Sequence, residues 1–394
     1  MIAQNKLEQE SAALRDLYRD IAENPAMAGA AEAHGLTEDE AQYAASQWSV
    51  MRQRFLRNKA ALAGGVIVLI YYLIALVAGF VAPYGLTTRF TNQVYLPPQA
   101  VHLFDGGQLR PFVYEVTTGF DANLRRVYET TENKIYLQFF AQGEPYKLLG
   151  FIDTDVHLFL AEGGIVSILG TDRQGRDMFS RIVLGSQVSL SIGLVGVVLS
   201  LVLGTVLGIA SGYFGGWVDE VIQRLIEIVR AFPTIPLWMA LSAAIPAGWS
   251  QEQTYFAITV ILSLIGWTWL ARQLRGLVLS LRESDYVTAA KLAGASDRRI
   301  IFKHLVPATM GQIIVVATLS LPAMIIAETA LSFLGLGLRP PVTSWGVLLQ
   351  EAQNFQSLAL YPWVLAPAFV IVIVILAFSF LGDGLRDAAD PFTI

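Results

Sequence analysis

Long apolar runs alternate with polar segments through most of the chain. Residues 61–83 form the first run, which is long enough as a helix to cross a hydrocarbon core, a distance of roughly 20 residues. Further runs occupy about 188–213, 254–270, 308–333 and 363–381, and one that is amphipathic at its start falls between residues 213 and 254. This pattern predicts an all-α polytopic membrane protein with six transmembrane helices.

Residues 1–60 precede the first span and are polar and acidic up to about residue 45. Thr37 and Glu40 have the spacing of a capping box, which opens a helix. Three apolar residues then recur at helical spacing beside arginines: Trp48, Met51 and Phe55. They indicate either an amphipathic helix on the inner membrane surface or a basic flank that orients the first span. Both interpretations place the N-terminus in the cytoplasm.

Residues 84–168 differ, because alternation with period two replaces the helical periodicity. The runs at 112–116, 126–130 and 134–140 predict strands, and Gly143, Glu144 and Pro145 predict a turn before residues 146–149. We therefore expect a small antiparallel β-rich insertion on the outer side, between the first and second spans.

The composition supports a membrane protein and narrows the chemistry. Of the 394 residues, 54% are hydrophobic and 15% are charged, whereas about a quarter are charged in soluble domains. There is no cysteine, no G-x-x-x-x-G-K-[ST] phosphate loop and no H-E-x-x-H pair. The four histidines are scattered over the sequence: His34, His102, His157 and His304. We expect no catalytic residue, metal site or bound cofactor in this chain, so another subunit would supply the energy.

The segment from Arg272 to Pro307 (272–307) is basic and lies between two apolar runs. Its positive charge predicts a cytoplasmic loop, which also places the C-terminus inside. Asp285 is positioned to cap a helix that Gly294 would end, and Asp297 to begin a second one. The basic residues are Arg272, Arg275, Arg282, Lys291, Arg298, Arg299 and Lys303.

Charged and helix-bending residues occur within the other spans. Glu220, Arg224 and Glu227 lie on one helical stripe, and we interpret them as the inner mouth of a pathway or an interface with a second subunit, the alternative being a snorkelling interfacial helix. Pro233 and Pro236 should bend the same helix, as a gate would require. Glu328 is an ionisable group inside the apolar run 308–333, and we interpret it as either a functional site or the partner in a structural hydrogen bond. Gly204, Gly208 and Gly212 recur every four residues and predict a stripe for close helix packing.

The basic segment resembles the cytoplasmic coupling loop of permease subunits of bacterial ABC importers. That pattern is Glu-Ala-Ala, three residues, Gly, nine residues, and an apolar-rich tail ending in Pro. The matching positions are Thr288, Ala289, Ala290, Gly294 and Pro307. Two positions depart: Thr288 stands where the family most often has Glu, and His304 where many members have Ile. If that glutamate pairs with a basic residue of the ATPase in other members, coupling in this chain uses another contact, because Thr288 carries no charge.

A second block, residues 169–193, resembles the segment before the second helix in the dipeptide, oligopeptide and nickel branch of these permeases. Its matching positions are Gly170, Thr171, Asp172, Gly175, Arg176, Asp177, Ser180, Arg181, Gly185 and Ser189. Thr171 and Asp172 are placed to cap a short helix, and Asp177 with Arg181 to form an i,i+4 ion pair. Residues 334–354 and 382–391 also resemble the family. Together these segments identify a second, C-type permease of the type I importer fold, with residues 169–394 as a five-helix core.

The resemblance implies the partners and the site residues. A homologous permease, two ABC ATPase subunits or domains that bind ATP and Mg²⁺, an extracytoplasmic binding protein and the lipid bilayer are expected, and nucleic acid is not. The residues implied in ATPase coupling are Asp285, Tyr286, Thr288, Ala289, Ala290, Lys291, Gly294, Ala295, Ser296 and Pro307. The residues implied in docking the binding protein are Asp172, Arg176 and Trp345.

The cargo and the role of the β-rich insertion stay open. The branch favours import of dipeptides or oligopeptides across a bacterial inner membrane, although its members also carry nickel and oligosaccharides. The insertion would support a binding protein or be a family-specific decoration. A secondary transporter or a membrane scaffold are alternatives of another class, and co-purification with a P-loop ATPase would separate these from the importer.

Overall fold

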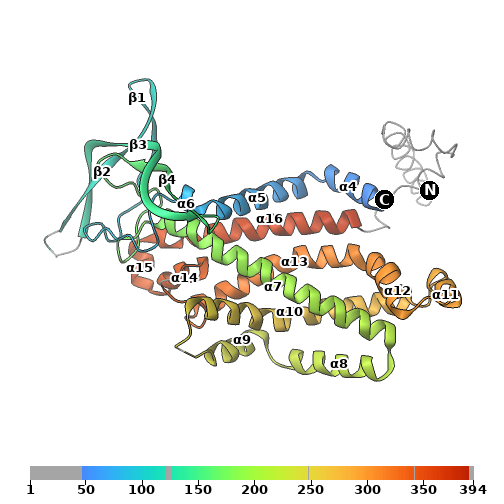
Figure 1. The fold of residues 1–394 in the computed structure, drawn as a ribbon. Coiled ribbons are helices and arrows are strands. Elements are labelled where there is room, and N and C mark those ends of the chain that lie inside the picture. Colours follow the sequence, from blue (N-terminus) through green and yellow to red (C-terminus); the bar gives the residue numbers. More distant parts are fainter. Residues whose placement is uncertain (1–46, 121, 123–125, 247, 341, 390–394) are drawn as a thin grey trace, which may run out of the picture.

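The structure is a computed structural model that describes residues 47–120, 122, 126–246, 248–340 and 342–389. In the described part of the chain five helical stretches are long and apolar enough to cross a membrane, and two further helices, bent by 86° at a short break, pass the same test as a pair (Figure 1). The predicted all-α polytopic fold is therefore confirmed, and the number of spans is six if the bent pair crosses the membrane as one. The spans are α5 (Lys59–Leu76), α7 (Met178–Phe214), α8 (Gly216–Ala231) with α9 (Thr234–Ala243), α10 (Gln251–Leu281), α12 (Asp297–Ile300) leading into α13 (Val306–Phe333), and α16 (Ala366–Ala389).

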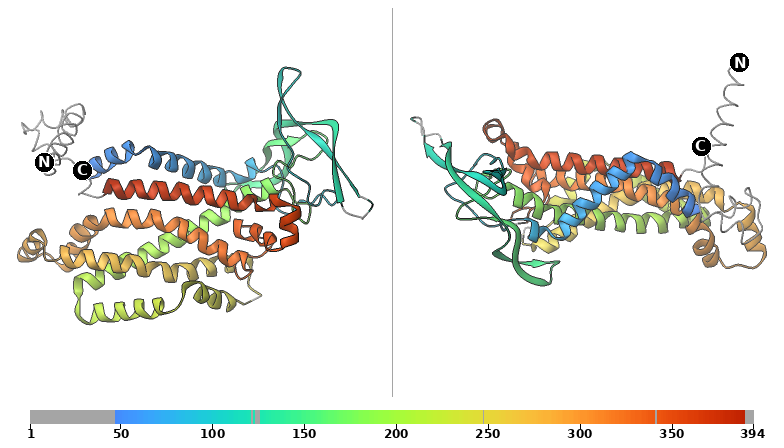
Figure 2. Two further views of the ribbon diagram at one scale, coloured as in Figure 1. Left: turned by 180° about the vertical axis from the view of Figure 1, so that it is seen from behind. Right: turned by 90° about the horizontal axis from the view of Figure 1, so that it is seen from above.

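Different elements lie at the two ends of the bundle. At one end lie a β-sheet and two short helices, α14 (Trp345–Leu349) and α15 (Phe355–Leu360). At the other end lie the short helix α11 (Asp285–Leu292), α12, and the start of α4 (Gln47–Arg57) (Figures 1 and 2). Helix α4 packs near the C-terminal end of α16. The predicted capping box at Thr37 lies outside the described residues.

The β-rich insertion forms an antiparallel sheet, as predicted, and its four strands follow one another in sequence order. Its strands are β1 (His102–Asp105), β2 (Gln108–Phe120), β3 (Arg126–Leu148) and β4 (Ile152–Ala161). The predicted turn at Gly143, Glu144 and Pro145 is wrong. Strand β3 continues through these residues and accommodates them as a break in register between Gln142 and Tyr146, because a bulge bends a strand without reversing it. The chain reverses later, at Leu149 and Gly150.

Helices α7 and α10 pack most closely where the glycine stripe lies. A Cβ added at Gly208 would lie 2.7 Å from the carbonyl oxygen of Ala271, and one at Gly204 would lie 3.0 Å from that of Trp267. No larger side chain fits there, so the stripe lets two backbones approach in a way that apolar surface alone would not achieve in lipid. The predicted role of the stripe in helix packing is confirmed.

The bend between α8 and α9 falls at the predicted prolines. Helix α8 ends at Ala231, and Pro233 is the first residue before α9. Proline cannot donate a backbone hydrogen bond, and it restricts the residue before it to an extended conformation, so the helix stops and changes direction. The first turn of α8 is held to α10 by two 2.6 Å bonds from the Arg275 guanidinium to the Asp219 carboxylate.

Candidate functional site

A pair of short helices projects from the end of the bundle opposite the sheet. Helix α11 begins at Asp285, with Ser284 in the N-cap position, so the prediction that Asp285 itself is the cap is wrong by one residue. The chain leaves α11 through Gly294, whose φ of +79° is a left-handed conformation that glycine adopts without strain. Ser296 then caps α12 by accepting a hydrogen bond from the Arg299 amide. The predicted stop and restart of the helix are confirmed.

The loop that projects from the bundle is shorter than the basic segment 272–307, which was predicted to form it. Residues 272–281 continue the spanning helix α10 and are not part of a loop, so the connection that projects from the bundle begins at residue 282. After α12 the chain makes a π-helical turn, Ile301–Leu305, immediately before α13. Pro307 lies in the first turn of α13. Proline has no backbone N–H, so it cannot donate a hydrogen bond to a carbonyl of the π-helical turn before it.

One face of α11 is anchored to the bundle. Val287 is fully buried and packs in a cluster with residues of α10 and α12, among them Leu274 and Ile300. Tyr213, at the end of α7, donates a 2.6 Å hydrogen bond to Asp297, and the ammonium of Lys291 lies over its ring. A force applied to α11 would therefore be transmitted to α7 and α10.

The opposite face of α11 is exposed and contains apolar side chains. Leu292 is 85% exposed, and Ala289 and Thr288 are open to solvent. Phe302, in the π-helical turn after α12, is 67% exposed. A Cβ added at Gly294 would meet no atom within 4 Å. His304, which stands where the family often has Ile, packs against the ring of Tyr286. An apolar face on an anchored helix is a surface that another protein would cover.

A cavity of about 1070 Å³ lies within the bundle, between α7, α9, α10, α13 and α16. Its walls are mostly apolar, with Trp238, Trp269 and Met324 among them. Polar groups are few, and Gln312 of α13 donates a hydrogen bond to Gln273 of α10 across the space. Sequence reasoning missed these two glutamines. Gln312 lies inside the apolar run 308–333, and that was a signal that could have found it, whereas Gln273 lies in the basic segment 272–307.

The residues predicted to form a pathway do not line this cavity. Glu220, Arg224 and Glu227 are exposed on α8, where Arg224 and Glu227 form a 2.9 Å ion pair with each other. They are exposed and do not line this cavity, which fits either an interface with another subunit or a snorkelling interfacial helix. Pro233 and Pro236 are exposed at the bend between α8 and α9.

Glu328 is a structural residue and not part of an accessible pathway. Its side chain is fully buried and accepts 2.7 Å hydrogen bonds from the hydroxyls of Ser332 and Ser344. A third hydroxyl, that of Ser189 on α7, lies 3.5 Å away and itself accepts a bond from the Trp345 amide. Of the two interpretations, the structural hydrogen bond is the one the geometry supports, since Glu328 joins α7, α13 and α14.

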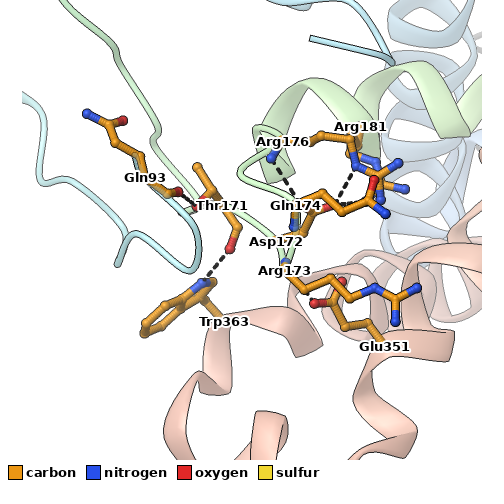
Figure 3. Close-up of polar contacts among 9 residues, drawn as sticks. All are labelled: Gln93, Thr171, Asp172, Arg173, Gln174, Arg176, Arg181, Glu351 and Trp363. Atoms are coloured by element: carbon orange, nitrogen blue, oxygen red, sulfur yellow. Dashed lines mark hydrogen bonds and ion pairs between the residues drawn. The ribbon is translucent and has the colours of Figure 1, made fainter. Parts of the chain in front are cut away.

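A second polar cluster lies at the sheet end, around Asp172 (Figure 3). The fully buried carboxylate of Asp172 accepts a 2.7 Å bond from Arg176 and pairs with Arg181. The predicted pair of Asp177 with Arg181 is wrong, because Asp177 instead caps α7 through a 2.7 Å bond from the Ser180 amide. Burial raises the pKa of the Asp177 carboxyl.

The three residues predicted to dock a binding protein are all buried. Asp172 and Trp345 have no exposed surface, and Arg176 is almost covered. The Trp345 indole donates a 3.0 Å hydrogen bond to the Ile182 carbonyl, which fixes α14 against α7. The prediction that these side chains contact a docked protein is therefore corrected. They hold the sheet end of the bundle together instead.

Two family comparisons cover most of the chain. Residues 204–394 match the family described as binding-protein-dependent transport system inner membrane component, and residues 46–98 match the N-terminal TM domain of oligopeptide transport permease C. The dipeptide transport system permease protein DppC of Lactococcus lactis is 35% identical over 361 residues, which cover 90% of this chain and 93% of that protein.

Two further similarities complete the comparison. The oligopeptide transport system permease protein OppC of Escherichia coli is 40% identical over 223 residues, covering 56% of this chain and 71% of that protein. A solved structure of the MetNI methionine ABC transporter in inward-facing conformations superposes with a TM-score of 0.43 and 17% identity, over 54% of this chain and 98% of that one.

A bundle of spanning helices around a cavity, with an anchored helix pair projecting at one end, has the architecture of a membrane permease. The chain belongs to the family of binding-protein-dependent transport system inner membrane components, and within it to the C-type permeases of the dipeptide and oligopeptide group. The family resemblance seen in the sequence is confirmed.

Proposed function

We propose that this chain is one of two permease subunits of an ATP-driven importer of dipeptides or oligopeptides. Its family membership and relatives with those cargoes in their names support this assignment. The cavity would form half of the translocation pathway, closed by the second permease. Its tryptophan faces suit apolar peptide side chains, and the amides of Gln273 and Gln312 suit peptide backbone groups.

The observation that carries the proposal is the exposed face of α11. Two ATPase subunits or domains, with bound ATP and Mg²⁺, would grip this face on each permease from the cytoplasm. When the ATPases close, α11 would move inward, and its links to α7 and α10 would carry the motion to the far end of the bundle. Two alternating states that ATP biases are sufficient for transport.

The coupling surface is tested by Gly294→Trp in the reconstituted complex. The indole would fill the open space beside Gly294 and prevent a close approach by the ATPase. We expect loss of ATP hydrolysis stimulated by binding protein and peptide, while membrane insertion is unchanged. Gly163→Trp is the matched control, because Gly163 also has a positive φ, of +76°, and open space around it, but lies in the loop after β4.

Stimulated hydrolysis equal to that of the parent complex in the Gly294→Trp variant would argue strongly against coupling through α11. Equal losses in both variants would point to backbone strain, since a non-glycine residue at a positive φ is disfavoured at either position.

A further inference from the structure

The turn that joins β3 to β4 carries apolar side chains where hairpin turns usually carry polar ones. Leu149, Phe151 and Ile152 are exposed, and Phe151 is 73% exposed. The backbone φ values of Leu149 and Gly150 are +55° and +83°, the combination found in type I′ turns. Asn, Asp or Gly normally occupies the first of these positions, because a leucine is strained there. The chain therefore keeps an apolar side chain at this tip against its local conformational preference.

The other hairpin of the sheet shows that the turn itself does not require leucine. In the turn between β1 and β2, Gly106 and Gly107 have the same φ values, +55° and +83°. Polar residues, Asp105 and Gln108, flank this turn. The same pair of φ values is thus adopted by two glycines in one hairpin and by an exposed leucine and a glycine in the other, so these φ values do not require a leucine.

The β3–β4 hairpin is held at the membrane boundary. Helix α5 begins at Lys59, and roughly 20 residues of helix cross the hydrocarbon core, so α6 (Ala78–Val81) lies at the far boundary. The Tyr146 ring of β3 packs on Gly79, where an added Cβ would lie 2.2 Å from the ring. Tyrosine is common at this depth, because its ring and hydroxyl suit the interface between lipid and water.

Beyond Tyr146 the hairpin continues toward the lipid and not away from it. Figures 1 and 2 show the β3–β4 turn reaching back past α6, beside the helices, to the level of the sheet-side end of α5. At this end of α5 the side chains of Leu73 and Leu76 are exposed and apolar. Lys147 and Asp153 are paired across the strands just behind the tip, where headgroups would solvate both charges.

We propose that residues 148–152 form a lipid wedge, which inserts its apolar side chains into the leaflet at the sheet end of the bundle. Together with the contact between Tyr146 and α6, the wedge would fix the position of the sheet relative to the membrane. This inference requires only that α5 spans the bilayer, and it does not depend on the cargo or on the ATPase. The exposed apolar side chains at the tip of the wedge lie at the level of the sheet-side end of α5, where Leu73 and Leu76 are also exposed, which is why lipid is the partner we assign.

The test uses the absence of cysteine from the chain, which allows one nitroxide label per variant. Phe151→Cys and, as the matched control in the other hairpin, Leu109→Cys are labelled in the full chain. Each is reconstituted into vesicles of phosphatidylethanolamine and phosphatidylglycerol. Electron paramagnetic resonance then compares relaxation of the label by oxygen, which concentrates in lipid, with relaxation by a water-soluble nickel chelate.

We expect oxygen to dominate at position 151 and the nickel chelate to dominate at position 109. Nickel accessibility at 151 equal to that at 109 would overturn the proposal, because the tip would then lie in water. Exclusion of both reagents at 151 would also overturn it, because a protein surface would then cover the tip. If the Phe151→Cys chain fails to insert, Leu149→Cys gives the same readout at the other side of the turn. Neither result bears on transport, so failure here is distinct from failure of the proposed function.

Discussion

At the scale of single residues, ionisable side chains at the sheet end of the bundle are buried or partly buried. Glu351 follows α14 and accepts a 2.8 Å hydrogen bond from the Arg173 amide, with the Asp172 carboxylate nearby (Figure 3). Burial, and secondarily the charge of Asp172, raises the pKa of the Glu351 carboxyl above its usual value of 4.5. The folded chain therefore binds a proton at Glu351 more tightly than the unfolded chain does.

Linkage gives the sign of the resulting pH dependence. Because the folded-state pKa is the higher one, the contribution of Glu351 to stability falls as pH rises from 4.5 through the folded-state pKa, and is constant above it. We expect Glu351→Gln to remove this loss, because glutamine keeps an oxygen for the Arg173 amide and has no charge to bury. Thermal unfolding of both purified chains over a pH series would then show the stability of the variant rising relative to that of its parent as pH rises. Parallel curves would contradict the burial of an ionising group there.

At the scale of elements, the fold depends on backbones in close contact inside lipid. Helices α7 and α10 touch along Gly204, Gly208 and Gly212, and α5 meets α16 in the same way at Gly384, where an added Cβ would lie 2.1 Å from that of Ala61. Lipid chains solvate apolar side chains as well as a neighbouring helix does, so such contacts gain their free energy from fit and not from exclusion of water.

This packing predicts opposite effects for two glycine substitutions. Gly208→Val places a branched side chain against the Ala271 backbone, and we expect the free energy of unfolding to fall by about 1–3 kcal/mol. Gly276→Ala, on the open face of α10, is the control and should raise it by roughly 0.5–1 kcal/mol, because alanine is the better helix former. Thermal or denaturant unfolding in detergent measures both. A neutral Gly208→Val would mean that α7 and α10 are not in contact there.

At the scale of the whole molecule, the projecting helices and the sheet lie at opposite ends of the bundle (Figure 1). If the basic segment faces the cytoplasm, as the positive-inside bias predicts, the sheet faces outward. Leu292 of α11 and Leu109 of the sheet are 85% and 72% exposed, so each offers an accessible position for a label.

We expect single-cysteine variants at these two positions to react from opposite sides. In sealed right-side-out vesicles, a membrane-impermeant maleimide should label Leu109→Cys directly, and Leu292→Cys only after the membrane is opened. The chain has no native cysteine, so the parent protein supplies the background. Labelling in the reverse order would invert the topology and remove the cytoplasmic position that coupling to an ATPase requires.

The amino-acid sequence alone determined the properties that depend on local chemistry. Apolar run length predicted the spans, period-two alternation predicted the sheet, and Gly294, Pro233 and the glycine stripe predicted a helix stop, a bend and a close contact. Each follows from neighbouring residues along the chain or from the residue type itself, so no knowledge of distant partners was needed.

Only the tertiary structure decided which residues meet. Arg181 pairs with Asp172 and not with Asp177, which is nearer to it in the sequence. Trp345 of α14 is buried, and Gln273 and Gln312 join in a cavity whose walls come from five helices. Sequence spacing specifies neighbours on one helix, but it carries no information on the rotation of that helix against others. The lining of the cavity and the burial of every charge depend on that rotation, which is set by the packing of the whole bundle.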